Sequence, residues 1–130
     1  MDTGIWRIVP LAPQVMAILK DLHDLTGQGE WVFPRMSQKG EPMGKTSMLA
    51  ALRGMGIGPD EMTPHGFRAM ARTLLDEVLG ERYNLIEMQL AHMVRDLNGR
   101  AYNRTVHLAE RTRMMMRCPS YLDELRFAVG

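Results

Sequence analysis

The sequence predicts a mainly α-helical fold with a small β element. Apolar residues recur at three- and four-residue spacing through most of the 130 residues, and helix-starting and helix-ending residues bracket these runs. One short β-branched run, IWRIVPL at residues 5–11, is interrupted by proline and is expected to form an edge strand. A chain of this length fits one domain, so residues 1–130 are expected to form a single domain.

Local start and stop signals then place six helices along the chain. Their expected ranges are residues 13–26, 47–53, 64–79, 85–90, 102–116 and 121–127. The third is the best defined, because Thr63 is a good N-cap, Pro64 suits the first helical position and Gly80 suits the stop. Its expected core-facing stripe is Phe67, Met70, Ala71, Leu74, Leu75 and Val78.

The signals that bound the other elements are weaker. Asn84 with Glu87 resembles a capping box that opens the fourth helix. Cys118-Pro119 is expected to end the fifth helix, and Ser120 is expected to cap the last one. Residues 31–33, WVF, are expected to form an extended piece, and residues 36–44 a polar loop.

Composition excludes some classes of protein. No apolar run approaches the roughly 20 residues that a membrane helix needs. The single cysteine, Cys118, excludes an intramolecular disulfide and indicates a reducing cytoplasm. The net charge of +1 does not by itself indicate a nucleic-acid binder, but residues 95–117 hold six arginines and two acids. Such a stretch either follows a phosphate backbone or forms a solvated helix face.

His65 and Arg68 lie three residues apart at the start of the third helix, so they project from one face, away from the apolar stripe. Cations are unfavourable there by about 0.3–1 kcal/mol each, because a helix N-terminus is already positive. A bound anion reverses this cost. Gly66 would let an oxygen-bearing ligand approach the backbone. The segment TPHGFR therefore indicates an anion site, with a plain pair of surface residues as the alternative.

Two residues further along the chain complete the candidate chemistry. His92 follows the apolar turn QLA, where a histidine is either functional or structural. Tyr102 stands between Arg100 and Arg104. Because a tyrosine with pKa about 10 is only about 0.1% ionised at pH 7, it becomes a nucleophile only beside positive charge or a base. A buried Tyr102 is the alternative. Rival tyrosines in weaker settings are Tyr83 and Tyr121.

The order and spacing of these residues resemble the tyrosine recombinases, in particular the prophage and phage-satellite integrases. HGFR comes first, then LAH, then Tyr102 ten residues after His92. The similarity extends through IVPLAPQ, WVFP, TPHGFRAMARTLLDE, IEMQLAH, AYNRT and RMMMRCPSYLDEL. These segments span residues 7 to about 126, nearly the whole chain.

The resemblance implies the catalytic-domain fold of that family and site-specific DNA recombination through a 3′-phosphotyrosyl intermediate. It makes Tyr102 the nucleophile and Arg68 a bidentate phosphate ligand. It gives His65 a part in proton transfer and makes His92 a hydrogen-bond donor to the phosphate. Further DNA contacts are expected from Arg72, Arg100 and Arg104. The reaction needs no cofactor or metal. The implied partners are double-stranded DNA at attachment sites and further copies of the chain assembled on it, in the cytoplasm and without a membrane.

Some parts of the family's pattern have no counterpart here. The family's first catalytic arginine precedes the strand that corresponds to IVPL, and its catalytic lysine lies in a hairpin just upstream, whereas residues 1–6 are MDTGIW. Lys39 and Lys45 lie on the wrong side of the first helix for that role. An N-terminally truncated chain is therefore expected, one that binds DNA weakly and does not recombine it, since a general acid contributes about 10²–10⁴-fold.

Other classes of function fit less well. A non-catalytic DNA-binding module or an inactive integrase remnant is the main alternative. A nucleotide-binding reading of Gly44-Lys45-Thr46 fails, because the phosphate loop needs a glycine where Lys39 stands. A metal site built from the histidines and Cys118 lacks ligand spacing.

Overall fold

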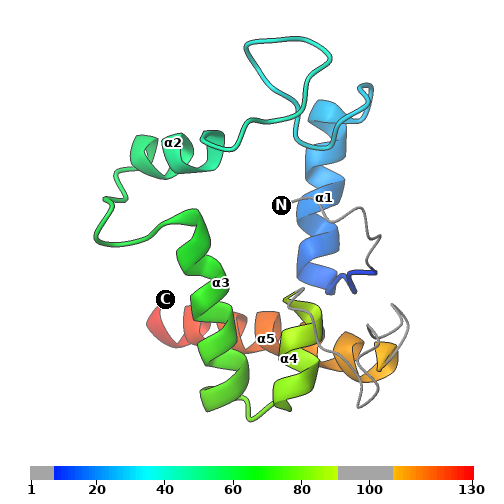
Figure 1. Cartoon of the computed structure of the whole chain (residues 1–130), viewed down its shortest axis with the longest axis vertical. Helices are drawn as coiled ribbons and strands as arrows, with labels where there is room; N and C mark the ends of the chain where they lie inside the picture. The colour runs from blue at the N-terminus through cyan, green and yellow to red at the C-terminus, as the bar shows by residue number, and fades with distance from the viewer. Residues whose placement is uncertain (1–7, 91–106) are drawn as a thin grey trace, which may run out of the picture. The chain divides into compact units, whose positions relative to one another are not determined.

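A computed structural model of the chain describes residues 8–90 and 107–130. The described residues are mainly helical, with the order α1 Pro13–Thr26, α2 Ser47–Gly54, α3 Pro64–Thr73, π-helix η1 Leu74–Val78, α4 Tyr83–Gln89 and α5 Leu108–Val129 (Figure 1). The chain divides into two compact units, residues 14–69 and residues 1–13 with 70–130. The single-domain interpretation stays a prediction. Within the described part of the chain, no helix is long and apolar enough to cross a membrane.

The first unit begins with the helix that the sequence predicts. α1 starts at Pro13, whose missing N–H costs nothing in the first turn. It ends at Thr26, and the backbone N–H of Gly27 donates to the His23 carbonyl at 2.8 Å. The Thr26 hydroxyl donates to the carbonyl of Val32 at 3.0 Å, which ties the helix end to the following loop.

The small β element of the described residues lies in this loop. Pro34 and Pro42 form an isolated antiparallel bridge, with the Arg35 N–H donating to the Glu41 carbonyl at 2.8 Å. The Trp31 indole N–H donates to the carbonyl of Gly40 at 3.0 Å, and Gly40 takes the positive φ of 87° that the turn requires. Residues 31–33, expected to be extended, form no strand and are bent at Val32 and Phe33. The following loop is closed by its own hydrogen bonds.

The predicted edge strand is not found in its described part. Residues 8–11 form no strand, while residues 5–7 lie outside the described residues. Pro10 has no N–H to donate to a sheet, and the carbonyl of Ile8 accepts a hydrogen bond from the Arg111 guanidinium at 3.4 Å. The Ile8 carbonyl is therefore bonded to a side chain of α5 and not to a neighbouring strand.

α2 follows as predicted and is held by a side chain from its last turn. Leu52 is its buried residue, and the N-cap residue Thr46 makes no side-chain cap bond. The Arg53 guanidinium donates to the carbonyls of Ile57 at 2.6 Å and Met62 at 3.2 Å. Arg53 therefore fixes the glycine-rich connector that leads to α3.

The predicted helix from Thr63 to Gly80 is present, but its last part is π-helical. The N–H of Leu79 donates to the carbonyl of Leu74, five residues back, at 2.9 Å, and Gly80 adopts the predicted left-handed stop with φ 65°. The wider turn changes the register of the apolar stripe. Leu75 is buried, whereas Val78 is exposed. Phe67 and Met70 are exposed as well, and α3 buries none of its own residues. The expected stripe is therefore wrong at Phe67, Met70 and Val78, and Leu75 is its buried member.

α4 begins one residue before the predicted cap. Its N-cap position is Arg82, which makes no side-chain cap bond, so the predicted Asn84–Glu87 capping box is wrong. The Asn84 side chain instead accepts a hydrogen bond from Arg82 at 3.4 Å. The Glu87 carboxylate faces Arg72 of α3. Glu87 thus pairs with Arg72 on α3 and does not cap its own helix.

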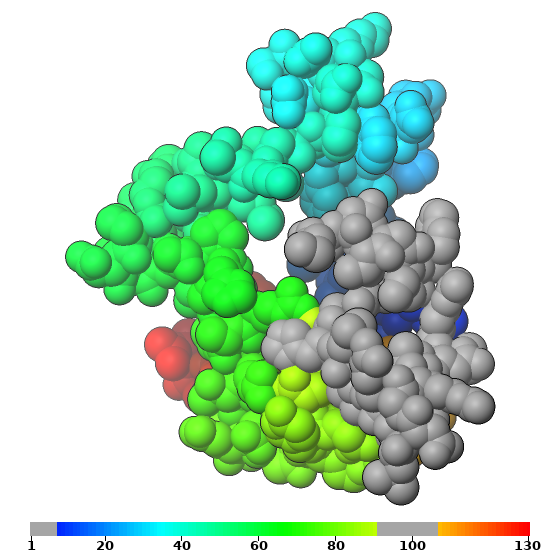
Figure 2. Space-filling view, viewed as in Figure 1, coloured from blue at the N-terminus to red at the C-terminus, as the bar shows by residue number. Residues whose placement is uncertain are grey.

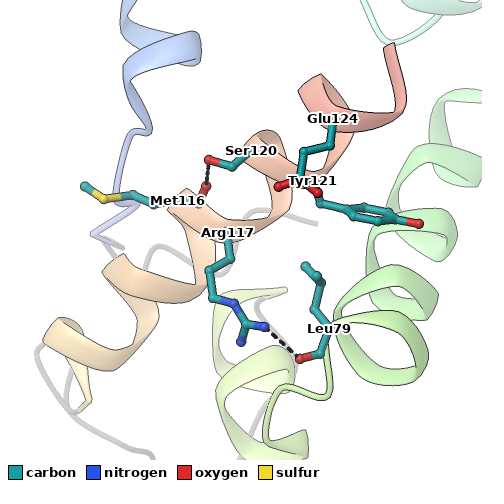
Figure 3. Close-up of a pocket in the computed structure, with 6 residues that line it drawn as sticks. All are labelled: Leu79, Met116, Arg117, Ser120, Tyr121 and Glu124. Carbon is teal, nitrogen blue, oxygen red and sulfur yellow. Dashed lines mark hydrogen bonds between the residues drawn. The ribbon is translucent and has the colours of Figure 1, made fainter. Parts of the chain in front are cut away.

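α5 runs through the expected stop at Pro119. Its first turns carry Met114, which forms the buried cluster of the second unit with Leu75, Leu85 and Ile86. Ser120, the predicted cap of a separate helix, donates instead to the Met116 carbonyl within α5 at 2.9 Å (Figure 3). α4, α5 and η1 pack on one another around this cluster, and α5 continues past Pro119 to Val129.

Candidate functional site

The N-terminus of α3 carries the first two predicted site residues and is capped as predicted. The Thr63 hydroxyl accepts a hydrogen bond from the Gly66 N–H at 3.0 Å. A Cβ at Gly66 would lie 2.8 Å from the Met62 sulfur and 3.3 Å from the Thr63 hydroxyl oxygen. A side chain at position 66 would therefore require the flexible Met62 side chain to shift.

His65 and Arg68 are both exposed on the first two turns of α3. The helix has no acidic residue in its first turn, and neither side chain has an ion pair or hydrogen bond within the described part of the chain. Two uncommitted basic side chains thus stand at the positive end of a helix. In chemical terms the arrangement suits an anion with several oxygen acceptors.

Arg72, predicted to contact DNA, is engaged with the protein. Its guanidinium lies 2.6 Å from a carboxylate oxygen of Glu87 and stacks 5.5 Å from the centre of the Tyr83 ring. Glu87 is only 6% exposed. A buried carboxylate needs a charged or hydrogen-bonding partner, because desolvation otherwise penalises it strongly. The DNA contact of Arg72 stays a prediction.

The other predicted site residues lie outside the described residues. These are His92, Arg100, Tyr102 and Arg104. α4 ends at Gln89 and α5 begins at Leu108, so the described helices bracket this part of the sequence.

Two described arginines from the basic stretch at residues 95–117 bond within the protein. Arg111 is 5% exposed and donates to the carbonyl of Ile8, and burial lowers the pKa of its guanidinium from the ordinary value. Arg117 pairs with Glu81 and donates to the carbonyl of Leu79 at 3.2 Å (Figure 3). The sequence did not indicate these roles, since both partners lie far away along the chain.

A second charged cluster, which sequence reasoning missed, lies at the start of α5. Glu110 accepts a hydrogen bond from Arg82 at 2.9 Å, and its other oxygen is 3.0 Å from Nδ1 of His107. The hydrogen bond with His107 and the charge of Arg82 lower the pKa of Glu110 against the opposing effect of desolvation. His107 adopts a left-handed φ of 54° at the N-cap position. The three-residue spacing of His107 and Glu110 was visible in the sequence, but Arg82 was not.

The rival tyrosines are placed by the structure in different settings. Tyr83 is 64% exposed and lies under the Arg72 guanidinium. Tyr121 lines a shallow hollow of about 400 Å³ on α5 with Leu79, Met116, Arg117, Ser120 and Glu124 (Figure 3). The hollow mixes apolar and charged groups, and Arg117 is already paired with Glu81. The arginine beside each of these tyrosines is already paired with a carboxylate, Arg72 with Glu87 and Arg117 with Glu81.

Comparison with known proteins gives a consistent set of relatives. The chain is 37% identical over 107 residues to the prophage integrase IntA of Escherichia coli strain K12, which covers 82% of this chain and 25% of that protein. It is 39% identical over 119 residues to the integrase of Enterobacteria phage P4, covering 90% of this chain and 27% of that integrase. With prophage integrase IntZ of Escherichia coli strain K12 the identity is 32% over 120 residues, covering 92% and 29%.

The matches cover most of this chain but only a small part of each relative. The chain spans between a quarter and three tenths of the length of the curated relatives it matches. No family model matches the sequence, and no solved structure matches it.

Proposed function

Because nearly the whole chain is homologous to one segment of these integrases, it belongs to the phage integrase family, and we propose that it carries part of a tyrosine recombinase active site. The proposed activity is site-specific DNA recombination by strand cleavage and rejoining. Its partners are double-stranded DNA at attachment sites and further copies of the chain assembled on that DNA, in the cytoplasm. The proposed fold of this segment is that of the C-terminal part of a tyrosine recombinase catalytic domain.

The proposed chemistry is a transesterification at phosphorus. The phenolic oxygen of Tyr102 attacks the scissile phosphate, so that a bond from phosphorus to the tyrosine oxygen forms and the bond to the 5′-oxygen breaks. The tyrosine loses its proton and the departing 5′-oxygen gains one. A second DNA end, through its 5′-hydroxyl, then reverses both steps. Each step exchanges one phosphoester bond for another and none is hydrolysed, so the exchange needs no high-energy cofactor.

The observation that carries the proposal is the exposed, uncommitted pair His65 and Arg68 at the capped start of α3. A phosphate in displacement gathers negative charge on its non-bridging oxygens, and preorganised cationic donors stabilise that charge. Arg68 would hold two of these oxygens, and His65 would assist proton transfer. His92 is proposed as a third donor, and Arg72, Arg100 and Arg104 as contacts to neighbouring phosphates.

Binding can be tested on the 130-residue chain itself. Fluorescence anisotropy with a labelled duplex, repeated over a range of salt concentrations, measures the affinity and the number of phosphates neutralised. Each neutralised phosphate contributes about 0.9 to the slope of log K against log salt concentration. We expect weak binding, and Arg68→Ala should lower the slope by about one phosphate. An unchanged slope in Arg68→Ala would remove Arg68 from the site.

The covalent step can be tested in a full-length protein, a chimera in which this chain replaces its homologous segment in the phage P4 integrase. Incubation with a nicked suicide duplex should give a protein–DNA adduct that survives denaturing electrophoresis. Tyr102→Phe should abolish the adduct and Tyr83→Phe should not. DNA binding without a Tyr102-dependent adduct would favour the non-catalytic DNA-binding module.

A further inference from the structure

We infer that the loop between α1 and α2, residues 27–46, is a second surface for DNA, on which Arg35, Lys39 and Lys45 bind backbone phosphates. The inference rests on the proposed function, which makes duplex DNA the partner of the chain. The loop belongs to the compact unit of residues 14–69, as does the start of α3. Figure 2 shows its atoms, light blue to cyan, projecting at the top of the view.

The backbone of the α1–α2 loop is held in place by bonds of its own. The N–H of Met43 donates to the carbonyl of Phe33 at 2.8 Å, and the Trp31 indole N–H donates to the carbonyl of Gly40 at 3.0 Å. These bonds join the two sides of the loop. Because the backbone is already ordered, a ligand has to fix only the side chains, which lowers the entropy cost of binding.

The cationic side chains of this loop have no carboxylate partner within the described part of the chain. Lys39 and Lys45 are exposed and form neither an ion pair nor a hydrogen bond with described residues. The exposed Arg35 donates to the neutral side-chain oxygen of Gln38 at 3.4 Å, so its charge is not compensated. The arginines of the second unit that pair with Glu81, Glu87 and Glu110 differ in this respect. The three loop cations are therefore available to an external anion.

Charges of opposite sign are segregated along this unit. Residues 31–53 contain four Lys or Arg and one Asp or Glu, whereas residues 14–30 and 54–69 together contain two Lys or Arg and five Asp or Glu. One of the four, Arg53, is bonded to the carbonyls of the connector before α3. A local excess of one sign attracts a polyanion and speeds its association. The loop is thus complementary to a DNA backbone, although the unit as a whole has as many acids as cations.

The lysines allow a test on the unmodified 130-residue chain, because its sequence contains only three, Lys20, Lys39 and Lys45. Lys20 is exposed on α1, outside the loop, and serves as the internal control. Limited acetylation with and without duplex DNA, quantified by mass spectrometry, measures the reactivity of each amine. With DNA at about ten times its Kd, about one chain in eleven stays free, so Lys39 and Lys45 should lose reactivity by up to about tenfold. Lys20 should keep its reactivity.

Substitutions measure the same contacts as ion release. Lys39→Gln/Lys45→Gln should lower the slope of log K against log salt concentration by about 1.8, and Arg35→Gln by about 0.9. The matched control Lys20→Gln removes the same charge outside the loop and should leave the slope unchanged. All four side chains are exposed, and circular dichroism confirms that the helices are kept.

The outcomes separate this inference from the proposed function. Unchanged reactivity of Lys39 and Lys45 on DNA binding, or equal protection of all three lysines, would overturn the loop as a DNA surface. If Arg68→Ala lowers the slope while the loop variants do not, the proposed function stands and the inference fails. If the loop lysines are protected and Arg68→Ala is neutral, the loop binds DNA and the proposed phosphate site at the start of α3 fails.

Discussion

Replacing Met114 with alanine tests whether the cluster between η1, α4 and α5 holds the second unit together. Met114 is fully buried, and its neighbours in the cluster, Leu75, Leu85 and Ile86, come from the other two elements. Met114→Ala removes three non-hydrogen atoms, and at about 0.8 kcal/mol for each buried group the transfer loss alone is about 2.4 kcal/mol. The remaining cavity adds to this, within the range of about 2–5 kcal/mol for such substitutions.

The matched control is Met116→Ala on the same helix, because Met116 is 42% exposed. Urea unfolding followed by circular dichroism gives the free energy of unfolding of both variants. We expect Met114→Ala to lower it by about 3 kcal/mol and Met116→Ala by less than about 1 kcal/mol. Equal losses in the two variants would refute the packing described here, because the two substitutions remove the same atoms and differ only in burial.

Two further predictions concern charged side chains of the same unit. Arg111→Met should lower the free energy of unfolding by about 1.5–3 kcal/mol, because a buried charge-assisted bond to the Ile8 carbonyl is lost, whereas the exposed Arg113→Met should change it little. Urea unfolding measures both. Glu110 has a lowered pKa in the folded chain, so its contribution is present above its unfolded pKa of about 4.3 and is lost as pH falls through the folded value. Glu110→Gln should therefore reduce the loss of stability on acidification, and an unchanged acid profile would contradict this.

Local signals in the sequence predicted the elements whose ends are set by their own residues. Pro13 and Gly27 bound α1, and Thr63 caps α3, since each signal acts within one turn of the helix. Gly80 provides the left-handed stop after η1 for the same reason. His65 and Arg68 are exposed as predicted, but so are Phe67 and Met70 of the stripe that was expected to face the core.

The predictions that were wrong depend on partners far away in the sequence. Glu87 was read as a local cap, but its carboxylate meets Arg72, fifteen positions earlier on another helix. The helix stop predicted at Pro119 is wrong, because α5 continues through it to Val129. No strand forms at Ile8, whose carbonyl instead accepts a hydrogen bond from a side chain 103 residues away. Single-sequence patterns carry no information about such pairs.

The structure also changes what the arginine content says about DNA binding. From the sequence, the basic stretch at residues 95–117 fits either a row of phosphate contacts or a solvated helix face, yet Arg111 and Arg117 are bonded to protein groups. Arg72 and Arg82 are likewise paired with carboxylates. Because a carboxylate already neutralises part of the charge of Arg72, Arg82 and Arg117, these arginines should contribute less to ion release on DNA binding than unpaired arginines would. We therefore expect the salt dependence of binding to be shallower than the arginine count alone implies, with Arg68 contributing about one phosphate.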